Sequence, residues 1–393
     1  MRSALAALRD ADWLTGERAR AWCVVLAAVS ALLVGWVLVA SGGGGLDPLG
    51  RPIGLDFIGF YAASTLALGG MAAAAYDPVA HEAAQIAVFG GTVSGVAFFY
   101  PPVFLLMCLP LALLPYQAAL LAWLAVGFGA MWAGVRRVVP GRWAVLPMLA
   151  FPGVLATAGH GQNGFLSAAC WSGCAVLMRR RPFMAGLCLG ALVFKPHLLL
   201  AAPVVLVARR RWAVVSGAAV SAVGLVGLSW LVLGAAAWRG FFAVAPLARM
   251  TLEAGLVSVV KMASVFAAVR VLGGEVWLGY AVRGVVAGWV VWMVWRVRGD
   301  GVAEGAAMAL GGMLMTPFLL SYDLTGLVLP LAWMMGEARR TGWLGWEKIV
   351  LLGAYVMPVA GPVLAGMGVP VAPVVVAALL GVLVRRTRRW GCG

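Results

Sequence analysis

Charged residues are scarce in this sequence. Of its 393 residues, 11% are Asp, Glu, Lys or Arg, whereas 63% are hydrophobic. An average soluble domain has about a quarter charged residues and about half apolar ones. A chain this long and this apolar cannot bury its hydrophobic side chains in a water-soluble core, so we predict a polytopic integral membrane protein. The composition excludes a soluble enzyme, a disordered chain and a disulfide scaffold.

Metal, disulfide and nucleotide motifs are absent as well. The six cysteines and three histidines are scattered without ligand spacing, which argues against a zinc site and a disulfide framework. The glycine run at 42–45 is not followed by the Lys-Ser/Thr of a phosphate-binding loop. No closely spaced acidic pair suggests a metal site for a nucleotide-linked substrate. We therefore expect no metal, no cofactor and no use of cytoplasmic nucleotides.

Acidic residues are few, and the formal net charge is +15. Such a balance can indicate a nucleic-acid partner, but most of the basic residues lie in the tails or in short segments between apolar runs, where Lys and Arg set membrane orientation. These segments are 1–20, 136–142, 179–181, 209–211, 296–298, 339–348 and 385–389. We assign them to the cytoplasm, with both termini, and expect a plasma (inner) membrane protein without a nucleic-acid partner.

With both termini on one side, the number of membrane crossings must be even. Apolar runs predict about twelve transmembrane spans, at 21–40, 116–135, 143–158, 163–178, 183–194, 197–208, 212–234, 276–295, 302–320, 323–338, 349–366 and 369–384. The first is interpreted as a retained anchor rather than a cleaved signal. The runs 183–194 and 197–208 are too short to cross alone and are expected to form a broken or re-entrant pair. The run 101–114 is interpreted as a shallow helix on the outer face.

Two long segments, 41–115 and 235–275, fall on the predicted outer side. The shorter outer turns at 160–164, 195–197 and 321–323 are also polar, whereas the inner loops are short and rich in arginine. Chemistry is therefore expected on the extracytoplasmic face, and a donor used there would have to be carried by a lipid. No clean repeat or soluble domain interrupts the chain, so 1–393 is treated as one membrane domain.

Two charged residues stand out because each lies in an apolar stretch. Asp56 would suit a general base if burial raised its pKa, or it could be a solvated loop residue or a helix N-cap. Lys195 lies between two apolar half-helices, a place where broken membrane helices often line a polar cavity. It could bind a phosphate, or its side chain could extend to the lipid headgroups.

The polar turns carry similar alternatives. His160, Gln162 and Asn163 offer the donors and acceptors that hydroxyl-rich ligands need, but glycine and asparagine also form tight turns. Tyr322 and Asp323 could contact a ligand, or Asp323 could cap the following span.

A series of short motifs keeps a fixed order over residues 50–330. They are Asp56-Phe57, Phe60-Tyr61-Ala62-Ala63-Ser64, Tyr76-Asp77-Pro78, Phe99-Tyr100-Pro101-Pro102, Gly159-His160-Gly161-Gln162-Asn163-Gly164, Lys195-Pro196-His197 and Leu320-Ser321-Tyr322-Asp323. In this order they resemble glycosyltransferase family 87, the polyprenol-phosphate-mannose-dependent mannosyltransferases of the membrane glycosyltransferase C superfamily. One departure is His197, where the family more often has Gln after Lys-Pro.

The resemblance implies a GT-C type all-α fold whose long first extracytoplasmic loop carries membrane-parallel helices. It implies transfer of a hexose, mannose in this family, from a polyprenyl-phosphate sugar to a hydroxyl of a glycolipid or glycan acceptor. Asp56 would act as the base of an inverting reaction, and Lys195 and His197 would stabilise the donor phosphate. Contacts to sugar or acceptor would come from Tyr61, Tyr100, His160, Gln162, Asn163, Tyr322 and Asp323.

Two other classes of membrane protein are alternatives. The broken pair around Lys195 also suits a transporter or a flippase of lipid-linked sugars, although no repeat symmetry supports it. A polysaccharide polymerase or ligase would be expected to have an Arg-rich outer loop, which this chain lacks. Geometry separates these classes, because a transferase should bring Asp56, Lys195 and His160 to one site, whereas a transporter should spread its polar groups along a path.

Overall fold

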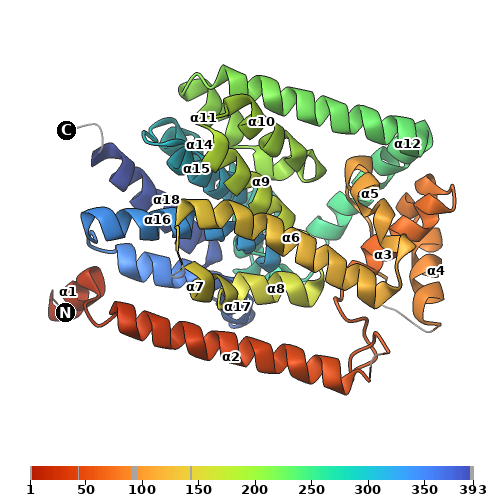
Figure 1. Ribbon diagram of the computed structural model, residues 1–393, viewed down its shortest axis with the longest axis horizontal. Helices are drawn as coiled ribbons and strands as arrows, with labels where there is room; N and C mark the ends of the chain where they lie inside the picture. Colours follow the sequence, from red (N-terminus) through yellow and green to blue (C-terminus); the bar gives the residue numbers. More distant parts are fainter. Residues whose placement is uncertain (1, 43, 91–94, 142–143, 390–393) are drawn as a thin grey trace.

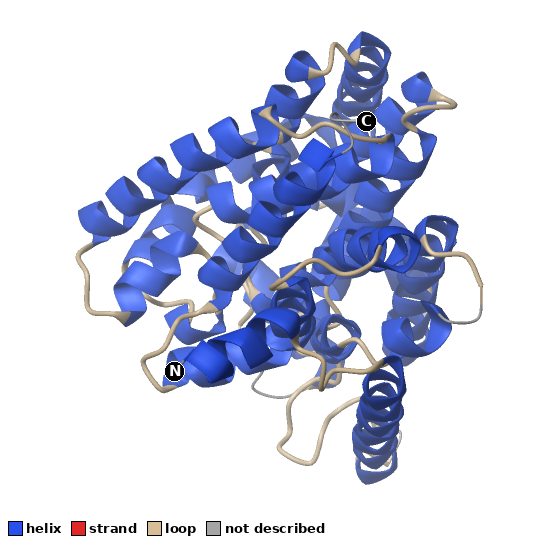
Figure 2. Cartoon of the chain, turned by 90° about the vertical axis from the view of Figure 1, so that its left-hand side faces the viewer, coloured by secondary structure: helices blue, strands red, loops and turns tan. Residues whose placement is uncertain are grey.

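The computed structural model describes residues 2–42, 44–90, 95–141 and 144–389. Within these ranges the chain is helical, and Figure 2 draws no strand. The extended pairings found there are single bridges between Leu46 and Pro52 and between Met262 and Leu320. The expected all-α fold is confirmed.

Five helices of the described chain are long and apolar enough to cross a membrane. They are α2 (Gly16–Ala40), α6 (Tyr116–Val138), α12 (Trp212–Glu253), α14 (Val276–Trp295) and α17 (Glu347–Gly366). At 1.5 Å per residue each reaches about 30 Å, the thickness of the hydrocarbon core. The apolar side chains of α2 are largely exposed, as suits a helix in lipid. The chain is therefore an integral membrane protein.

The remaining helices are shorter. They are α1 (Arg2–Asp10), α3 (Phe57–Leu68), η1 (Ala72–Tyr76), α4 (Pro78–Phe89), α5 (Pro102–Cys108), η2 (Leu109–Leu113), α7 (Val145–Leu149), α8 (Pro152–His160), α9 (Gly164–Leu177), α10 (Pro182–Gly190), η4 (Ala191–Phe194), η5 (Pro196–Leu199), α11 (Ala202–Ala208), η6 (Val259–Lys261), α13 (Val265–Val271), α15 (Gly301–Met315), η7 (Ser321–Leu327), α16 (Val328–Thr341) and α18 (Ala372–Arg389). Seven of the twelve predicted spans fall on these elements, so the number of crossings stays a prediction.

Proline explains several of the interruptions. Pro152, Pro182 and Pro196 each stand at the start of a helix, where the missing N–H removes no intrahelical hydrogen bond. The run 183–208 is divided into α10, η4, η5 and α11, with Lys195 in a non-helical conformation at the junction. The sequence indicated a break at this point, and the structure has one.

The second predicted outer segment begins inside a helix. The expected span 212–234 ends at Gly234, whose φ of 78° and ψ of 165° interrupt α12, but helical structure then continues to Glu253. A glycine tolerates this conformation, which a residue with a Cβ rarely adopts. The segment 235–275 therefore consists mainly of helix, followed by η6 and α13.

Helices α2, α6 and the first part of α12 run in roughly the same direction across the molecule (Figure 1). In Figure 1, α2 and α12 lie along opposite edges of the bundle, and α3, α4 and α5 gather at one end. Helix α1 and the end of α18 lie at the opposite end. This arrangement is compatible with termini that share one membrane face, and the assignment of that face rests on the arginine pattern.

Helices α10 and α12 cross at glycines. A Cβ on Gly217 of α12 would lie 2.1 Å from the carbonyl oxygen of Phe183, and one on Gly186 of α10 would lie 2.2 Å from the carbonyl oxygen of Val214. The two backbones are therefore in direct contact, as at small-residue crossings of membrane helices.

We predict that Gly217→Ala lowers the stability of the folded protein by about 1–3 kcal/mol, because the backbone oxygen of Phe183 must move. Gly224→Ala is the matched control on the same helix, since no atom lies within 4 Å of its added Cβ. Thermal unfolding of both variants in detergent measures the difference. Equal midpoints would contradict the close crossing.

Candidate functional site

Asp56 follows a strained turn. Gly54 has a φ of 83°, and Leu55 has a φ of 33°, which is unfavourable for a residue with a Cβ. Such conformations cost about 1–3 kcal/mol and are often retained at functional sites. The backbone N–H of Asp56 donates to the carbonyl of His160 at 3.1 Å. The turn is therefore tied to a segment about a hundred residues later.

A close approach between two turns requires glycine at position 161. Gly161 has a φ of 61°, and an added Cβ would lie 2.5 Å from the Cβ of Phe57 and 2.8 Å from the carbonyl oxygen of Gly54. The indole N–H of Trp123 donates to the Gly161 carbonyl at 3.2 Å. The turn after α8 therefore packs closely against the start of α3.

The carboxylate of Asp56 belongs to a chain of hydrogen bonds. Gln162 Nε2 donates to Asp56 Oδ2 at 2.9 Å, and the Tyr100 hydroxyl donates to Gln162 Oε1 at 3.1 Å. Burial, followed by the negative charge of Asp323, raises the pKa of the Tyr100 hydroxyl well above its usual value, so Tyr100 stays a donor. The backbone N–H of Asn163 adds a longer bond to Gln162 Oε1 at 3.3 Å. The amide of Gln162 is thus oriented toward Asp56.

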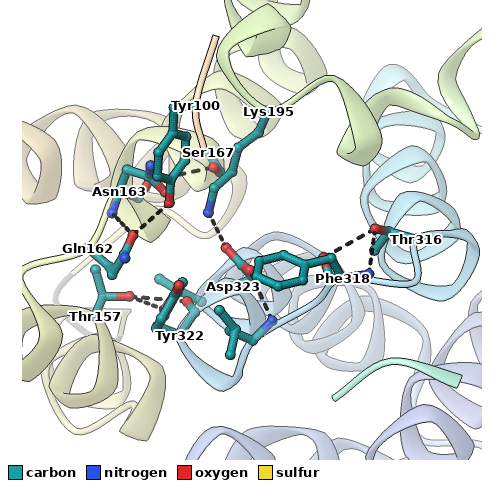
Figure 3. A network of polar contacts seen from close by, with 12 residues as sticks. Tyr100, Thr157, Gln162, Asn163, Ser167, Lys195, Thr316, Phe318, Tyr322 and Asp323 are labelled. Atoms are coloured by element: carbon teal, nitrogen blue, oxygen red, sulfur yellow. Dashed lines mark hydrogen bonds and ion pairs between the residues drawn. The ribbon is translucent and has the colours of Figure 1, made fainter. Parts of the chain in front are cut away.

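A second carboxylate in the same region is paired with a cation. Lys195 Nζ lies 2.5 Å from Asp323 Oδ1, and the two side chains are only 3% and 2% exposed. Figure 3 shows the ammonium and carboxylate pointing at each other. Asp323 Oδ2 also accepts from the N–H of Leu320 at 3.1 Å. Asp323 therefore balances the charge of Lys195 and also fixes the start of η7.

Aromatic rings connect the ion pair to the turn after α8. Lys195 Nζ lies 5.4 Å from the centre of the Tyr322 ring and 5.8 Å from that of Tyr100. The Tyr322 ring lies 5.6 Å from the imidazole of His160. His160 Nδ1 donates to the Ala156 carbonyl at 2.9 Å, which leaves Nε2 as the other polar atom of the ring. Asp56, Lys195 and His160 are thus linked in one cluster of contacts, Asp56 through its backbone N–H and Lys195 through the Tyr322 ring.

Two predicted site residues are placed differently. The Tyr61 hydroxyl donates to the Leu114 carbonyl at 2.9 Å, and Tyr61 lines a separate cavity of about 630 Å³ with Phe89 and Tyr116. His197 is half-buried beyond Pro196, and its Nε2 has no hydrogen-bond partner among the described residues. Tyr61 therefore lies outside the hydrogen-bonded cluster, and the imidazole of His197 retains an unused polar atom.

Two buried threonines were not predicted. Thr157 and Thr325 place their hydroxyl oxygens 2.7 Å apart, and Thr157 also donates to the Tyr322 carbonyl at 3.2 Å. Thr325 donates to the carbonyl of Gly153. These bonds, drawn in part in Figure 3, hold η7 against α8. In the sequence, Thr157 and Thr325 stand out only as a hydroxyl residue within an apolar run.

No group of three or more His, Cys, Asp and Glu side chains could hold a metal ion in the part of the chain that the structure describes.

The fold and site define an integral membrane protein with a polar centre formed where short helices end. A family model of glycosyltransferase family 87 matches residues 98–321, more than half of the chain. The chain belongs to glycosyltransferase family 87 and is a membrane glycosyltransferase. The match includes Tyr100, Gln162 and Lys195, whereas Asp323 lies just after its end and Asp56 lies well before its start. No curated protein and no solved structure matches the chain.

We predict that Lys195→Met destabilises the protein by about 3–5 kcal/mol, because it leaves the Asp323 carboxylate buried without its counter-charge. The double variant Lys195→Met, Asp323→Leu removes both charges and should recover much of the loss. Unfolding in detergent, followed by tryptophan fluorescence, measures both. A double variant as unstable as the sum of the two single variants would show that the charges are not coupled.

Proposed function

We propose that the chain transfers a hexose, most simply mannose, from a polyprenyl-phosphate sugar to a hydroxyl of a glycolipid or glycan acceptor. The observation that carries this proposal is the difference between the two carboxylates of the site. Asp323 is neutralised by Lys195, whereas the hydrogen bond of Asp56 comes from the neutral amide of Gln162. Asp56 is half-buried and is the carboxylate available to accept a proton.

The proposed reaction is a single displacement with inversion. The acceptor oxygen attacks the anomeric carbon, the bond from that carbon to the phosphate oxygen breaks, and the acceptor proton passes to Asp56. Gln162 holds Oδ2, which orients the carboxylate so that its other oxygen can face the acceptor. One catalytic carboxylate suffices, because the leaving polyprenyl phosphate needs no proton from a second one.

The leaving phosphate needs positive charge close by, and we assign Lys195 and His197 to it. Lys195 is held in place by Asp323, so no rearrangement is needed when the phosphate develops charge. The buried Nε2 of His197, which has no partner among the described residues, could donate a hydrogen bond to a phosphate oxygen.

We assign the sugar hydroxyls to the polar atoms between these groups. They are contributed by Tyr100, His160, Gln162, Asn163, Tyr322 and Asp323. Tyr61 is proposed as an acceptor contact only, through the 630 Å³ cavity that it lines. Family membership favours this transferase over a flippase with the same interrupted helices.

The proposed location of the reaction is the extracytoplasmic face of the plasma membrane. Helices α3, α4 and α5 gather at the end of the bundle opposite α1 and the arginine-rich end of α18 (Figure 1). The positive-inside rule assigns that arginine-rich end to the cytoplasm. The donor lipid and the acceptor would then meet at the outer leaflet.

We predict that Asp56→Asn lowers the rate of sugar transfer about 10²- to 10⁴-fold, because an amide cannot accept the acceptor proton. The assay follows labelled polyprenyl-phosphate mannose in membranes that contain equal amounts of each variant. Glu82→Gln is the matched control, since Glu82 is an exposed carboxylate of the same outer segment.

Equal transfer by wild type and Asp56→Asn would remove Asp56 from the chemistry. If the wild type transfers no mannose but transfers another lipid-linked sugar, the donor class stands and the choice of mannose is wrong. If no lipid-linked sugar is transferred, the proposed function is wrong.

A further inference from the structure

A second buried polar network lies next to the turn that carries Asp56. His81 of α4 is 2% exposed, and its Nε2 lies 2.9 Å from the carbonyl oxygen of Gly59. Gly59 is in the first turn of α3, and its own N–H donates to the carbonyl of Asp56 at 3.1 Å. His81 therefore holds the helical turn that begins at Asp56.

Gln85, one helical turn after His81, binds a different segment. Its Oε1 accepts the N–H of Val96 and its Nε2 donates to the Val96 carbonyl, both at 3.0 Å. The same Nε2 lies 3.0 Å from His81 Nδ1. Gln85 is 1% exposed, so these bonds are shielded from water. Both N–H groups and the oxygen of the Gln85 amide are therefore engaged in hydrogen bonds.

The network determines which imidazole nitrogen carries the proton. Val96 fixes the orientation of the Gln85 amide, since the oxygen must face the backbone N–H. Gln85 Nε2 is therefore a donor to His81 Nδ1, which must be unprotonated. His81 Nε2 carries the hydrogen that it donates to the Gly59 carbonyl. The bonds match a neutral His81, and because the Val96 carbonyl also lies within hydrogen-bond reach of the imidazole, a proton on Nδ1 would compete with Gln85 for that carbonyl.

Both ends of this network lead to the proposed site. A Cβ on Gly59 would lie 3.3 Å from Val96, so α3 packs directly on the segment that Gln85 binds. That segment continues through Phe98, whose ring lies 6.0 Å from His81 and 5.7 Å from Tyr100. Tyr100 in turn orients Gln162. The network thus joins the Asp56 turn to the start of its hydrogen-bond chain.

The other groups facing His81 are few. A cavity of about 120 Å³, with room for several waters, is lined by His81, Tyr76, Glu82 and Gln85, and α12 contributes Val244. The Asp77 carboxylate is occupied, because it accepts from two N–H groups at the start of α4. Burial is the largest effect on His81 and lowers the pKa of its imidazole.

We propose that His81 and Gln85 are positioning residues for sugar transfer, and that protonation of His81 breaks the Gln85 bond and releases Val96 and Tyr100 from the Asp56 turn. This inference rests on the proposed function of Asp56. A proton on Nδ1 would face the N–H of Gln85, and the amide cannot rotate without losing both bonds to Val96. Transfer should therefore slow in acid.

The direction of the pH dependence follows from the different proton binding of His81 in the folded and unfolded states. The folded protein disfavours the imidazolium, so the unfolded or opened state binds more protons as the pH falls below the ordinary histidine value of about 6.5. The network is intact above that pH. The network weakens as the pH falls toward the lower pKa that His81 has in the folded protein. Below that pKa the stability that the network contributed is completely lost.

The kinetic test compares the dependence of kcat on pH for wild type, His81→Gln and the control Glu275→Gln, which changes an exposed carboxylate outside the cavity that His81 lines. We expect wild type and control to lose kcat progressively as the pH falls from 7.5 to 5.5, by less than about ten-fold because the pKa of His81 is lowered, with a smaller change in KM. His81→Gln keeps an uncharged donor that cannot be protonated in this range, so its kcat should change little. An acid loss in His81→Gln equal to that of wild type would overturn the proposal.

A second readout needs no activity. Hydrogen exchange of the Val96 amide, corrected for the intrinsic pH dependence, should show less protection at pH 5.5 than at 7.5 in wild type, by less than about ten-fold, and no such change in His81→Gln. Protection that does not depend on pH in wild type would overturn the proposal. Loss of protection in a protein that transfers no sugar would instead count against the proposed function alone.

Discussion

The buried ion pair between Lys195 and Asp323 joins two segments of the site that lie far apart in the sequence. In a buried site neither charge is stable alone, so each side chain holds the other in place. The pair fixes the junction between η4 and η5 against the start of η7, which lies 128 residues later. It also neutralises Asp323, and that assigns the two carboxylates different tasks. Asp56, whose carboxylate accepts from the neutral amide of Gln162, is the carboxylate that we propose for proton transfer.

The ion pair lies where the helices around it are interrupted. Lys195 has a φ of −134° between two short helices, and the turn at 161–163 separates α8 from α9. Irregular backbone at membrane depth is tolerated where it is buried in protein or lines a polar site. The hydroxyls of Thr157 and Thr325 satisfy carbonyls at this place. The same interruptions explain why apolar runs overcount the long helices.

Part of this site could be predicted from the sequence, and part could not. A single charge in an apolar run is visible without a structure, and this identified Asp56 and Lys195. Pairing across 128 residues is not visible, so Lys195 and Asp323 were assigned separate roles. Tyr61 was grouped with the sugar or acceptor contacts because of the family resemblance, yet its ring packs on Tyr116. His81 drew no attention, because a histidine in an outer segment looks solvated until α3 is packed on it.

The geometry at Asp56 therefore depends on packing between segments and not on one helix. Leu55 remains at a φ of 33° only because the backbone around it is held, by the Asp56 N–H on the His160 carbonyl and by the contact of Gly161 with Gly54. The strain is local, but the bonds that hold it come from α8 and the turn after it. A site assembled in this way is rigid when all contacts are present. It is also sensitive to a change in any one of them, because a small displacement of a carboxylate alters its alignment with the acceptor hydroxyl.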